Sequence, residues 1–309
     1  MVERSFVAFG TIVTVQICTD ATERANTAAG KLEALYRVLE RDWRAFGPGE
    51  LGQANEQLAR AEPVQLSPAL AALVRQAFAL HGKSGGLFEP RVGELVRLWG
   101  FQDLAGGLPS APPPEESLAQ ARRDLAAAAL PVLEGDVLRP TAALRLELAG
   151  IAKGAALAAG AKTLESAGIR HALIAIGGDI IAIGSRGDRA WVAGLRDPRG
   201  PGVLGRVALR PGEAALSSGD YERHYDTAAG RMHHILDPRS GRPTRGVAGV
   251  TVLSLDPAAG NAAAVTLMVG GPGAFESLTT ALGMEFAMLV TADGERLLTA
   301  GMRARLGQT

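Results

Sequence analysis

The sequence has little cysteine, little lysine and no excess of charge of either sign. Its 309 residues include one cysteine, Cys18, which excludes an internal disulfide framework and any multi-cysteine metal site. Cys18 ends a β-branched, apolar run, so a buried thiol without a chemical role is the favoured interpretation. The 32 basic residues balance the 32 acidic ones, so electrostatics favours neither nucleic acid nor an anionic membrane as a partner.

Long hydrophobic runs are absent too. The apolar stretches are alanine-rich and interrupted, and none approaches the roughly 20 residues of a transmembrane helix, so no integral membrane segment is expected. Residues 1–6 lack the basic-then-apolar order of a secretory signal, and no lipobox is present. We therefore expect a cytoplasmic protein, unless a leader is missing from this sequence. Its length suffices for one large domain or two closely packed ones.

The order of predicted elements favours an α+β fold. Apolar residues recur at helical spacing over residues 21–44, and Ser67-Pro68 provides the cap and first turn of another helix. From about residue 172 strands dominate, with helical patterns inserted at 261–269 and 274–282. Strands in runs, joined by hairpin-length turns, predict mixed antiparallel sheets with packed helices rather than a doubly wound parallel sheet.

Residues 147–154 (Glu-Leu-Ala-Gly-Ile-Ala-Lys-Gly) form the most informative motif. The alternation over residues 144–148 predicts a strand that ends near Gly150, followed by a helix from about Lys153. Backbone N–H groups at a glycine-lined helix start attract an anion, and Lys153 is one of only four lysines in the chain. Glu147 could accept a hydrogen bond from a ligand. An ordinary strand–helix corner with a solvated lysine is equally consistent.

Other motifs are ambiguous when taken singly. Gly177-Gly178-Asp179 lies between two apolar β-runs, which indicates a bulge, a close ligand approach or a tight backbone crossing. The run 218–221 (Ser-Gly-Asp-Tyr) could line a phosphate or ribose, or form an ordinary turn. His233 and His234 would face opposite ways on a strand, so one of them could serve as a general base. A packed histidine is the alternative, and no second ligand at zinc spacing accompanies them.

The set and order of these motifs resemble the ApbE family of FAD:protein FMN transferases along nearly the whole chain. The matching segments are residues 9–11 (Phe-Gly-Thr), 43–55, 85–101 (Gly-Gly-Leu-Phe-Glu-Pro-Arg-Val-Gly, ending in Leu-Trp-Gly-Phe), 147–154, 177–179, 218–221 and 234–241 (His-Ile-Leu-Asp-Pro-Arg-Ser-Gly).

The resemblance implies a single ApbE-like (T-fold-like) domain over residues 1–309. It implies that FAD is bound with Mg²⁺ at its pyrophosphate. The FMN half is transferred to a threonine or serine hydroxyl of a target flavoprotein, within a Ser/Thr-Gly-Ala-Ser/Thr type motif, and AMP is released. Members of the family are often periplasmic or membrane-anchored.

Site residues are carried over by position. His234 would take the proton of the acceptor hydroxyl, and the metal would meet the Gly150 carbonyl and the side chains at Asn261 and Val265. The positions where the family contacts FAD are Phe9, Phe46, Leu87, Phe88, Glu89, Glu147, Lys153 and Leu236.

The metal positions depart from the family pattern. Aspartate is usual at Asn261 and threonine at Val265. An asparagine carbonyl is a poorer ligand for a hard divalent ion than a carboxylate, and valine offers no ligand. Thr266 is adjacent but points about 100° away on an ideal helix. The alternative function is therefore a non-catalytic FAD-binding protein that has lost its metal site.

Overall fold

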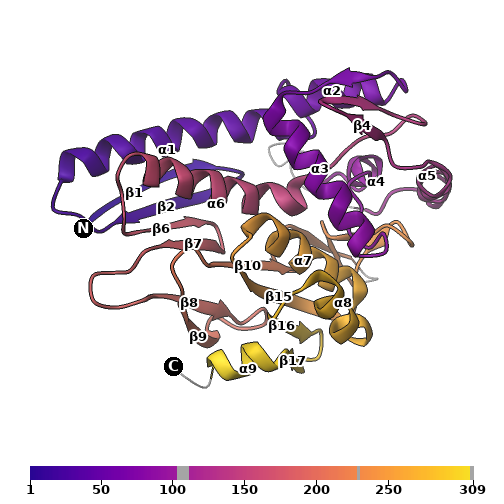
Figure 1. The fold of residues 1–309 in the computed structure, drawn as a ribbon. Coiled ribbons are helices and arrows are strands. Elements are labelled where there is room, and N and C mark those ends of the chain that lie inside the picture. The colour runs from indigo at the N-terminus through magenta and orange to yellow at the C-terminus, as the bar shows by residue number, and fades with distance from the viewer. Residues whose placement is uncertain (103–110, 228–229, 307–309) are drawn as a thin grey trace.

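An eight-stranded antiparallel sheet forms the centre of the structure, a computed structural model that describes residues 1–102, 111–227 and 230–306 (Figure 1). Neighbouring strands are antiparallel throughout. Their order across the sheet is β1 (Val2–Ala8), β2 (Thr11–Ile17), β6 (Ala172–Ile176), β7 (Asp179–Ile183), β10 (Ala214–Gly219), β15 (Val247–Ser254), β16 (Phe286–Thr291) and β17 (Arg296–Leu298).

Two adjacent hairpins have two-residue turns that lie at the same end of the strands. Phe9 and Gly10 join β1 to β2 with φ of 55° and 67°, the positive values that a tight hairpin turn requires. Gly177 and Gly178 join β6 to β7, and the Gly177 N–H donates to the Ile12 carbonyl at 3.0 Å. The paired glycines are therefore a hairpin turn, and the expectation of a bulge or a crossing within a strand was wrong.

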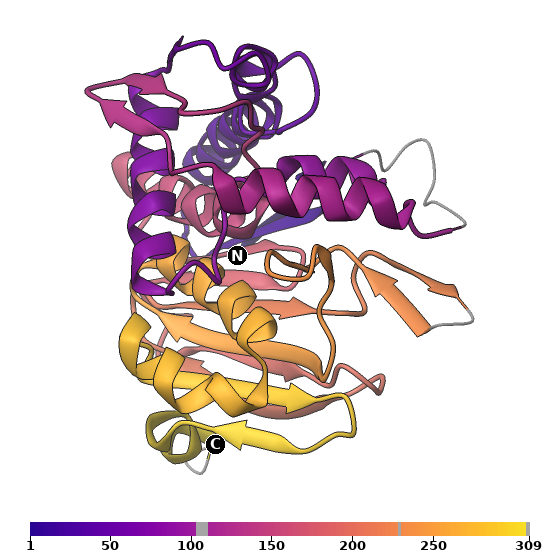
Figure 2. The same cartoon turned by 90° about the vertical axis from the view of Figure 1, so that its right-hand side faces the viewer.

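Four helices cover one face of the sheet: α1 (Thr22–Asp42), α6 (Ala149–Ser166), α7 (Pro257–Gly270) and α8 (Phe275–Leu282) (Figures 1 and 2). Helices α6 and α7 consist largely of alanine and glycine, so their backbones approach closely. A β-carbon built on Gly154 would lie 2.5 Å from the Pro257 carbonyl carbon. The two helices can pack this way only because residue 154 has no side chain.

The opposite face carries the ribbon of β8 (Trp191–Arg196) and β9 (Val203–Leu209), together with α9 (Ala300–Leu306). Trp191, Leu195 and Val207 are buried there against sheet residues such as Phe286 and Met288. Strand β8 alternates buried and exposed residues, the pattern of a ribbon with one face packed and one face in water.

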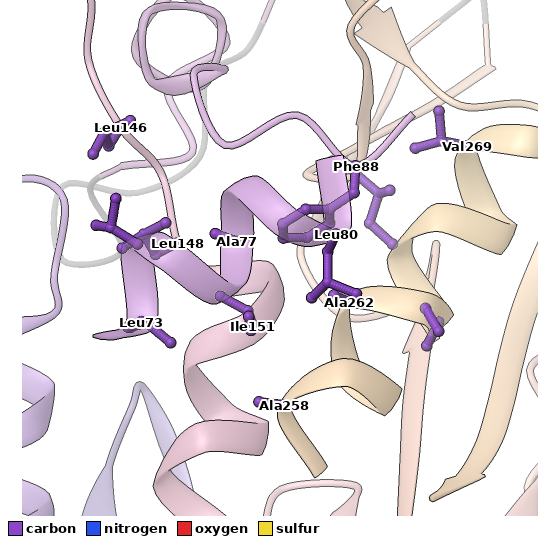
Figure 3. Packing of buried hydrophobic residues seen from close by; sticks show 14 of the residues in the cluster. Leu73, Ala77, Leu80, Phe88, Leu146, Leu148, Ile151, Ala258, Ala262 and Val269 are labelled. Atoms are coloured by element: carbon purple, nitrogen blue, oxygen red, sulfur yellow. The ribbon is translucent and has the colours of Figure 1, made fainter. Parts of the chain in front are cut away.

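The remaining elements build out one end of the molecule. They are α2 (Glu50–Leu58), β3 (Val64–Gln65), α3 (Pro68–Lys83), α4 (Gly93–Leu98), α5 (Glu115–Ala127), β4 (Val132–Glu134), β5 (Val137–Arg139), β11 (His224–Thr227), β12 (Gly230–His233), β13 (Leu236–Asp237), β14 (Arg242–Pro243) and the 3₁₀ turn η1 (Pro272–Ala274). Ser67 caps α3 as predicted, its hydroxyl accepting from the Leu70 N–H. Buried residues of α3 pack with Phe88, the start of α6 and α7 (Figure 3).

The predicted strand over residues 144–148 is wrong. The segment keeps its alternation, with Leu144, Leu146 and Leu148 buried, but it pairs with no strand of the described chain. Its backbone is instead held by a side chain: the Leu146 N–H donates to Asn55 Oδ1 at 2.7 Å, and Asn55 Nδ2 donates to the Leu146 carbonyl at 2.8 Å. This buried amide, together with single hydrogen bonds to the backbone of Leu58, Pro90 and Gly93, replaces a sheet neighbour. Helix α6 then begins at Ala149, earlier than predicted.

The mixture of helices and antiparallel sheets confirms the α+β prediction. Among the described residues, no helix is both long enough and apolar enough to span a membrane. The single domain over residues 1–309 stays a prediction.

Candidate functional site

One cleft of about 480 Å³ gathers most of the residues selected from the sequence. It is bordered by the two hairpin turns, the end of β10, the first turn of α6 and one side of α7. The predicted site residues that line it are Phe9, Leu87, Phe88, Glu89, Glu147, Gly150, Lys153, His234, Leu236, Asn261 and Val265. Segments far apart in the sequence therefore meet at one place.

The N-terminal end of α6 opens on this cleft. Ala149, Gly150 and Lys153 all line it, so the positive end of the helix dipole faces the same space. Glu147 accepts from the Ala149 N–H at 2.8 Å, and burial raises the pKa of its carboxyl. This is the arrangement that binds an anionic group, and Glu147 adds an acceptor beside it.

Lys153 is held by a buried carboxylate. Its Nζ lies 2.5 Å from Asp179 Oδ2, and the Asp179 side chain is fully buried. Asp179 Oδ1 also accepts from the Ser217 N–H at 2.7 Å, which ties β7 to β10 beneath the cleft. Asp179 therefore fixes the position of the ammonium and offsets its charge.

Apolar walls flank the anion-binding end. Phe9 packs edge-on against Tyr36, with ring centroids 5.5 Å apart, and holds a left-handed backbone conformation at the hairpin tip. Phe88 is buried against Gly150, where an added β-carbon would lie 3.2 Å from Phe88 Cε2. With Leu87 and Leu236 these rings form surfaces that suit a flat aromatic ligand.

Glu89 lines the cleft, but its carboxylate is already paired with protein side chains. Its two oxygens pair with Arg91, at 2.8 Å to Nε and 2.6 Å to a terminal nitrogen. His81 Nδ1 is 3.5 Å from the same carboxylate. Its charge is therefore largely satisfied within the protein.

The two histidines separate as predicted for neighbours facing opposite ways. His233 is buried with Nε2 2.9 Å from the Thr244 carbonyl oxygen, whereas His234 lines the cleft. The His234 backbone N–H donates to the Arg223 carbonyl at 3.1 Å. Burial, followed by the positive charge of Arg223, lowers the pKa of His234 to about 3. Its imidazole is therefore neutral at physiological pH, the form that accepts a proton.

Known proteins share this chain's sequence and architecture. A model of the ApbE family matches residues 9–288. The chain belongs to the ApbE family. A curated FAD:protein FMN transferase of Rhodobacter capsulatus is 38% identical over 311 residues, covering 99% of this chain and 58% of that protein. The chain thus spans little more than half of that relative's length. The Vibrio cholerae transferase is 32% identical over 79% of this chain and 73% of its own length.

Solved ApbE structures have the same fold. The ApbE protein of Thermotoga maritima aligns with a TM-score of 0.89 at 25% identity, and the alignment covers 99% of each chain. The flavin transferase ApbE of Vibrio cholerae aligns with a TM-score of 0.83, also at 25% identity and 99% of each chain. These matches confirm the ApbE-like architecture predicted from the motif order.

The metal positions expected for an ApbE protein do not offer a metal-ligand set here. Asn261 is buried, and its Oδ1 accepts from the Gly154 N–H at 3.2 Å. Its other terminal atom is an N–H donor, which cannot coordinate a cation. Val265 packs its methyl groups toward Gly150, so it supplies apolar surface where a ligand oxygen was expected. The Thr266 hydroxyl bonds back to the Ala262 carbonyl at 2.8 Å.

Only the Gly150 carbonyl remains of the expected ligands. A divalent ion such as Mg²⁺ prefers several hard oxygen ligands, with carboxylates among them. The described part of the chain contains no group of three or more histidine, cysteine, aspartate or glutamate side chains arranged to hold a metal ion. The residues present therefore do not fit the magnesium site that the resemblance implies.

Phe46 does not join the other predicted FAD contacts. It is partly buried and packs against two core clusters, one of which contains Leu95 and Trp99, and it is not among the residues that line the cleft. Phe46 therefore contributes to the hydrophobic core and not to the surface of the cleft.

Some cleft residues were missed by the sequence reasoning. Arg196 and Arg223 line the cleft, and Arg223 comes two residues after the run 218–221 that was singled out, whose Tyr221 also lines the cleft. Asp220 of that run points elsewhere, into a bidentate pair with Arg199 at 2.8 and 2.7 Å. The nearness of Arg223 to that run was the available signal, but the sequence does not say where its side chain points or what it contacts.

Proposed function

We propose that this chain transfers the FMN half of FAD to a threonine or serine hydroxyl of a target flavoprotein and releases AMP. The observation that carries the proposal is the convergence of Lys153, the α6 N-terminus, apolar ring-sized walls and a neutral His234 in one cleft. The names of the curated relatives, FAD:protein FMN transferases, support the same reaction.

Different residues of the cleft would contact different parts of FAD. The flavin ring would lie against the apolar walls near Phe88 and Leu236, which shield it from water. The pyrophosphate would face the start of α6 and Lys153, whose ammonium Asp179 keeps in place. The helix start and the ammonium would supply hydrogen-bond donors and partial positive charge to the phosphate oxygens before and during the attack on phosphorus.

His234 would act on the acceptor. As the hydroxyl oxygen attacks the phosphorus of the FMN half, its proton passes to the neutral imidazole. The bond from that phosphorus to the oxygen of the AMP phosphate breaks, and AMP leaves with the electron pair. A ligand carrying negative charge would offset the nearby cations that lower the pKa of His234, so the imidazole becomes a stronger base when FAD is bound.

Magnesium dependence is not part of this proposal, although the resemblance implies it. Asn261 and Val265 do not provide the ligands, so no step is assigned to a metal. The acceptor is proposed to be a flavoprotein with a Ser/Thr-Gly-Ala-Ser/Thr type motif. The cytoplasmic location likewise stays a prediction.

A second candidate function is FAD binding without transfer. The specific observation in its favour is the altered pair on α7, Asn261 and Val265. Such a protein would hold FAD in the same cleft without releasing AMP.

The test is an incubation of the purified chain with FAD and an acceptor protein bearing the proposed motif, with and without Mg²⁺. Covalent flavin on the acceptor, read by in-gel fluorescence, and stoichiometric AMP support transfer. His234→Gln should lower the transfer rate by about 10²- to 10⁴-fold while FAD still binds. His224→Gln removes a histidine on β11 outside the cleft lining and should transfer normally. Bound FAD with no AMP under any metal condition would establish the second candidate instead.

A further inference from the structure

The three cations that line the cleft differ in whether a carboxylate is paired with them. Lys153, Arg196 and Arg223 line it. Lys153 is paired with Asp179 at 2.5 Å. Arg196 stacks over the Tyr221 ring, 4.4 Å from its centroid, and lies 3.9 Å from a Glu222 oxygen. Each of these two charges already has a carboxylate partner.

Arg223 differs from the other two. It is partly buried, and its guanidinium has no ion pair or hydrogen bond among the residues that the structure describes. Its backbone is nevertheless fixed, because its carbonyl accepts from the His234 N–H at 3.1 Å. An arginine held at a cleft wall without a partner has its donors available to a ligand.

The location of Arg223 matches the phosphate end of the cleft. Its carbonyl bonds to His234, and its positive charge acts on two cleft residues: it opposes the rise in the pKa of Glu147 that burial causes, and it adds to the fall in the pKa of His234 that burial causes. A planar guanidinium stays charged at any working pH and can donate two parallel hydrogen bonds to phosphate oxygens.

The metal positions explain why such a charge is needed. A pyrophosphate brings at least two negative charges, and the Lys153–Asp179 pair supplies no net positive charge to offset them. The side chains expected to hold a divalent ion are an engaged amide at Asn261 and a valine at 265.

We propose that Arg223 binds the pyrophosphate of FAD and supplies, in place of a chelated divalent ion, the positive charge that this cleft needs. The inference rests on the proposed function, because it takes FAD as the ligand of the cleft. It makes binding of FAD by this chain independent of added metal and dependent on Arg223.

The test is a fluorescence titration of the full chain with FAD in EDTA, repeated with riboflavin, which has the ring but no phosphate. Arg223→Gln should weaken FAD binding about ten- to a hundredfold, the scale of one lost hydrogen-bonded charge. Riboflavin binding should not change. Arg231→Gln is the matched control: Arg231 lies on β12 outside the cleft lining, and Asp220, its neighbour at 3.7 Å, keeps its pair with Arg199.

Each outcome decides between distinct statements. If wild-type chain binds neither FAD nor riboflavin, the proposed function fails. If it binds FAD and Arg223→Gln binds equally well, the proposed function stands and the role of Arg223 is refuted. The role of Arg223 would also be refuted by a wild-type chain that binds FAD only when Mg²⁺ is added.

A gain-of-metal variant provides an independent measurement. Asn261→Asp combined with Val265→Thr, introduced into the Arg223→Gln chain, should restore FAD binding when Mg²⁺ is present and not in EDTA. Restoration that is equal with and without Mg²⁺ would contradict the replacement of a metal by Arg223.

Discussion

Replacement of Gly154 by alanine tests how closely α6 and α7 must approach for the cleft to form. The new β-carbon would lie 2.5 Å from the Pro257 carbonyl carbon and 2.8 Å from Ala258 Cα, where ordinary contact begins at 3.4 Å. Both neighbours are backbone atoms, which cannot rotate away. The Pro257 carbonyl oxygen would be closer still, so the helices would have to separate by more than about 1 Å.

The expected loss of stability follows from two opposing effects. Alanine has the higher helix propensity, which favours the variant by about 1 kcal/mol. Overpacking against backbone costs up to about 3 kcal/mol, so the free energy of unfolding should fall by about 2 kcal/mol. The hydrogen bond from the Gly154 N–H to Asn261, 3.2 Å long, would stretch as well. Both α6 and α7 line the cleft, so FAD affinity should fall with stability.

Urea unfolding followed by circular dichroism measures the effect, with a flavin titration in parallel. Gly82→Ala is the matched control, because Gly82 lies near the end of α3 with no atom within 4 Å of its would-be β-carbon. That variant should be as stable as the wild type or slightly more so. If Gly154→Ala unfolds at the same urea concentration as Gly82→Ala, the steric argument is refuted.

Three further expectations concern the same site. Lys153→Ala leaves the buried Asp179 without its cation, so the free energy of unfolding should fall by about 2–3 kcal/mol. The double variant Lys153→Ala with Asp179→Asn should recover stability but not FAD binding. If it recovered both, a ligand role for Lys153 would be contradicted. The pKa of His234 is lowered to about 3, so the unfolded chain takes up the proton first and stability should fall as pH drops below about 6.5, by about 1–2 kcal/mol at about pH 5. His234→Gln should flatten that dependence in urea unfolding, and an unchanged slope would count against it. Asn55→Ala removes both hydrogen bonds to Leu146 and a third to the Ala45 carbonyl, and it should lower the free energy of unfolding by about 2–4 kcal/mol in the same assay. A loss below about 0.5 kcal/mol would mean that the backbone hydrogen bonds of residues 144, 145 and 147 hold the segment without Asn55.

Local sequence patterns predicted those helices and strands in which neighbouring residues share the same secondary-structure preference. The Ser67-Pro68 helix start and the antiparallel strands after residue 172 are examples. The segment 144–148 was misassigned because its alternation is real, but its backbone bonds to the side chain of Asn55, 91 positions from Leu146, and to loop backbone instead of to a strand. Periodicity reports which residues are buried and not what satisfies the backbone.

In the site, too, the sequence predicted which residues lie together but not which partners each side chain has. Motif order placed Lys153, His234 and the α7 positions in one cleft correctly, although their roles stay predictions. Arg223 could not be selected from sequence, since nothing in the chain around it says that its guanidinium lacks a partner. That property depends on which carboxylates the fold brings near, and the fold brings Asp179 and Glu222 to other cations.

The wide spacing of the cleft-lining residues has a consequence for folding and synthesis. The lining runs from Phe9 in the first hairpin to Val269 near the end of α7, so a chain that ends before α7 lacks part of the site. A ligand of this cleft would bind only the folded state, and it would raise the melting temperature in proportion to the logarithm of its concentration above the dissociation constant. During translation, such a ligand can first stabilise the chain only after α7 has left the ribosome and packed against α6.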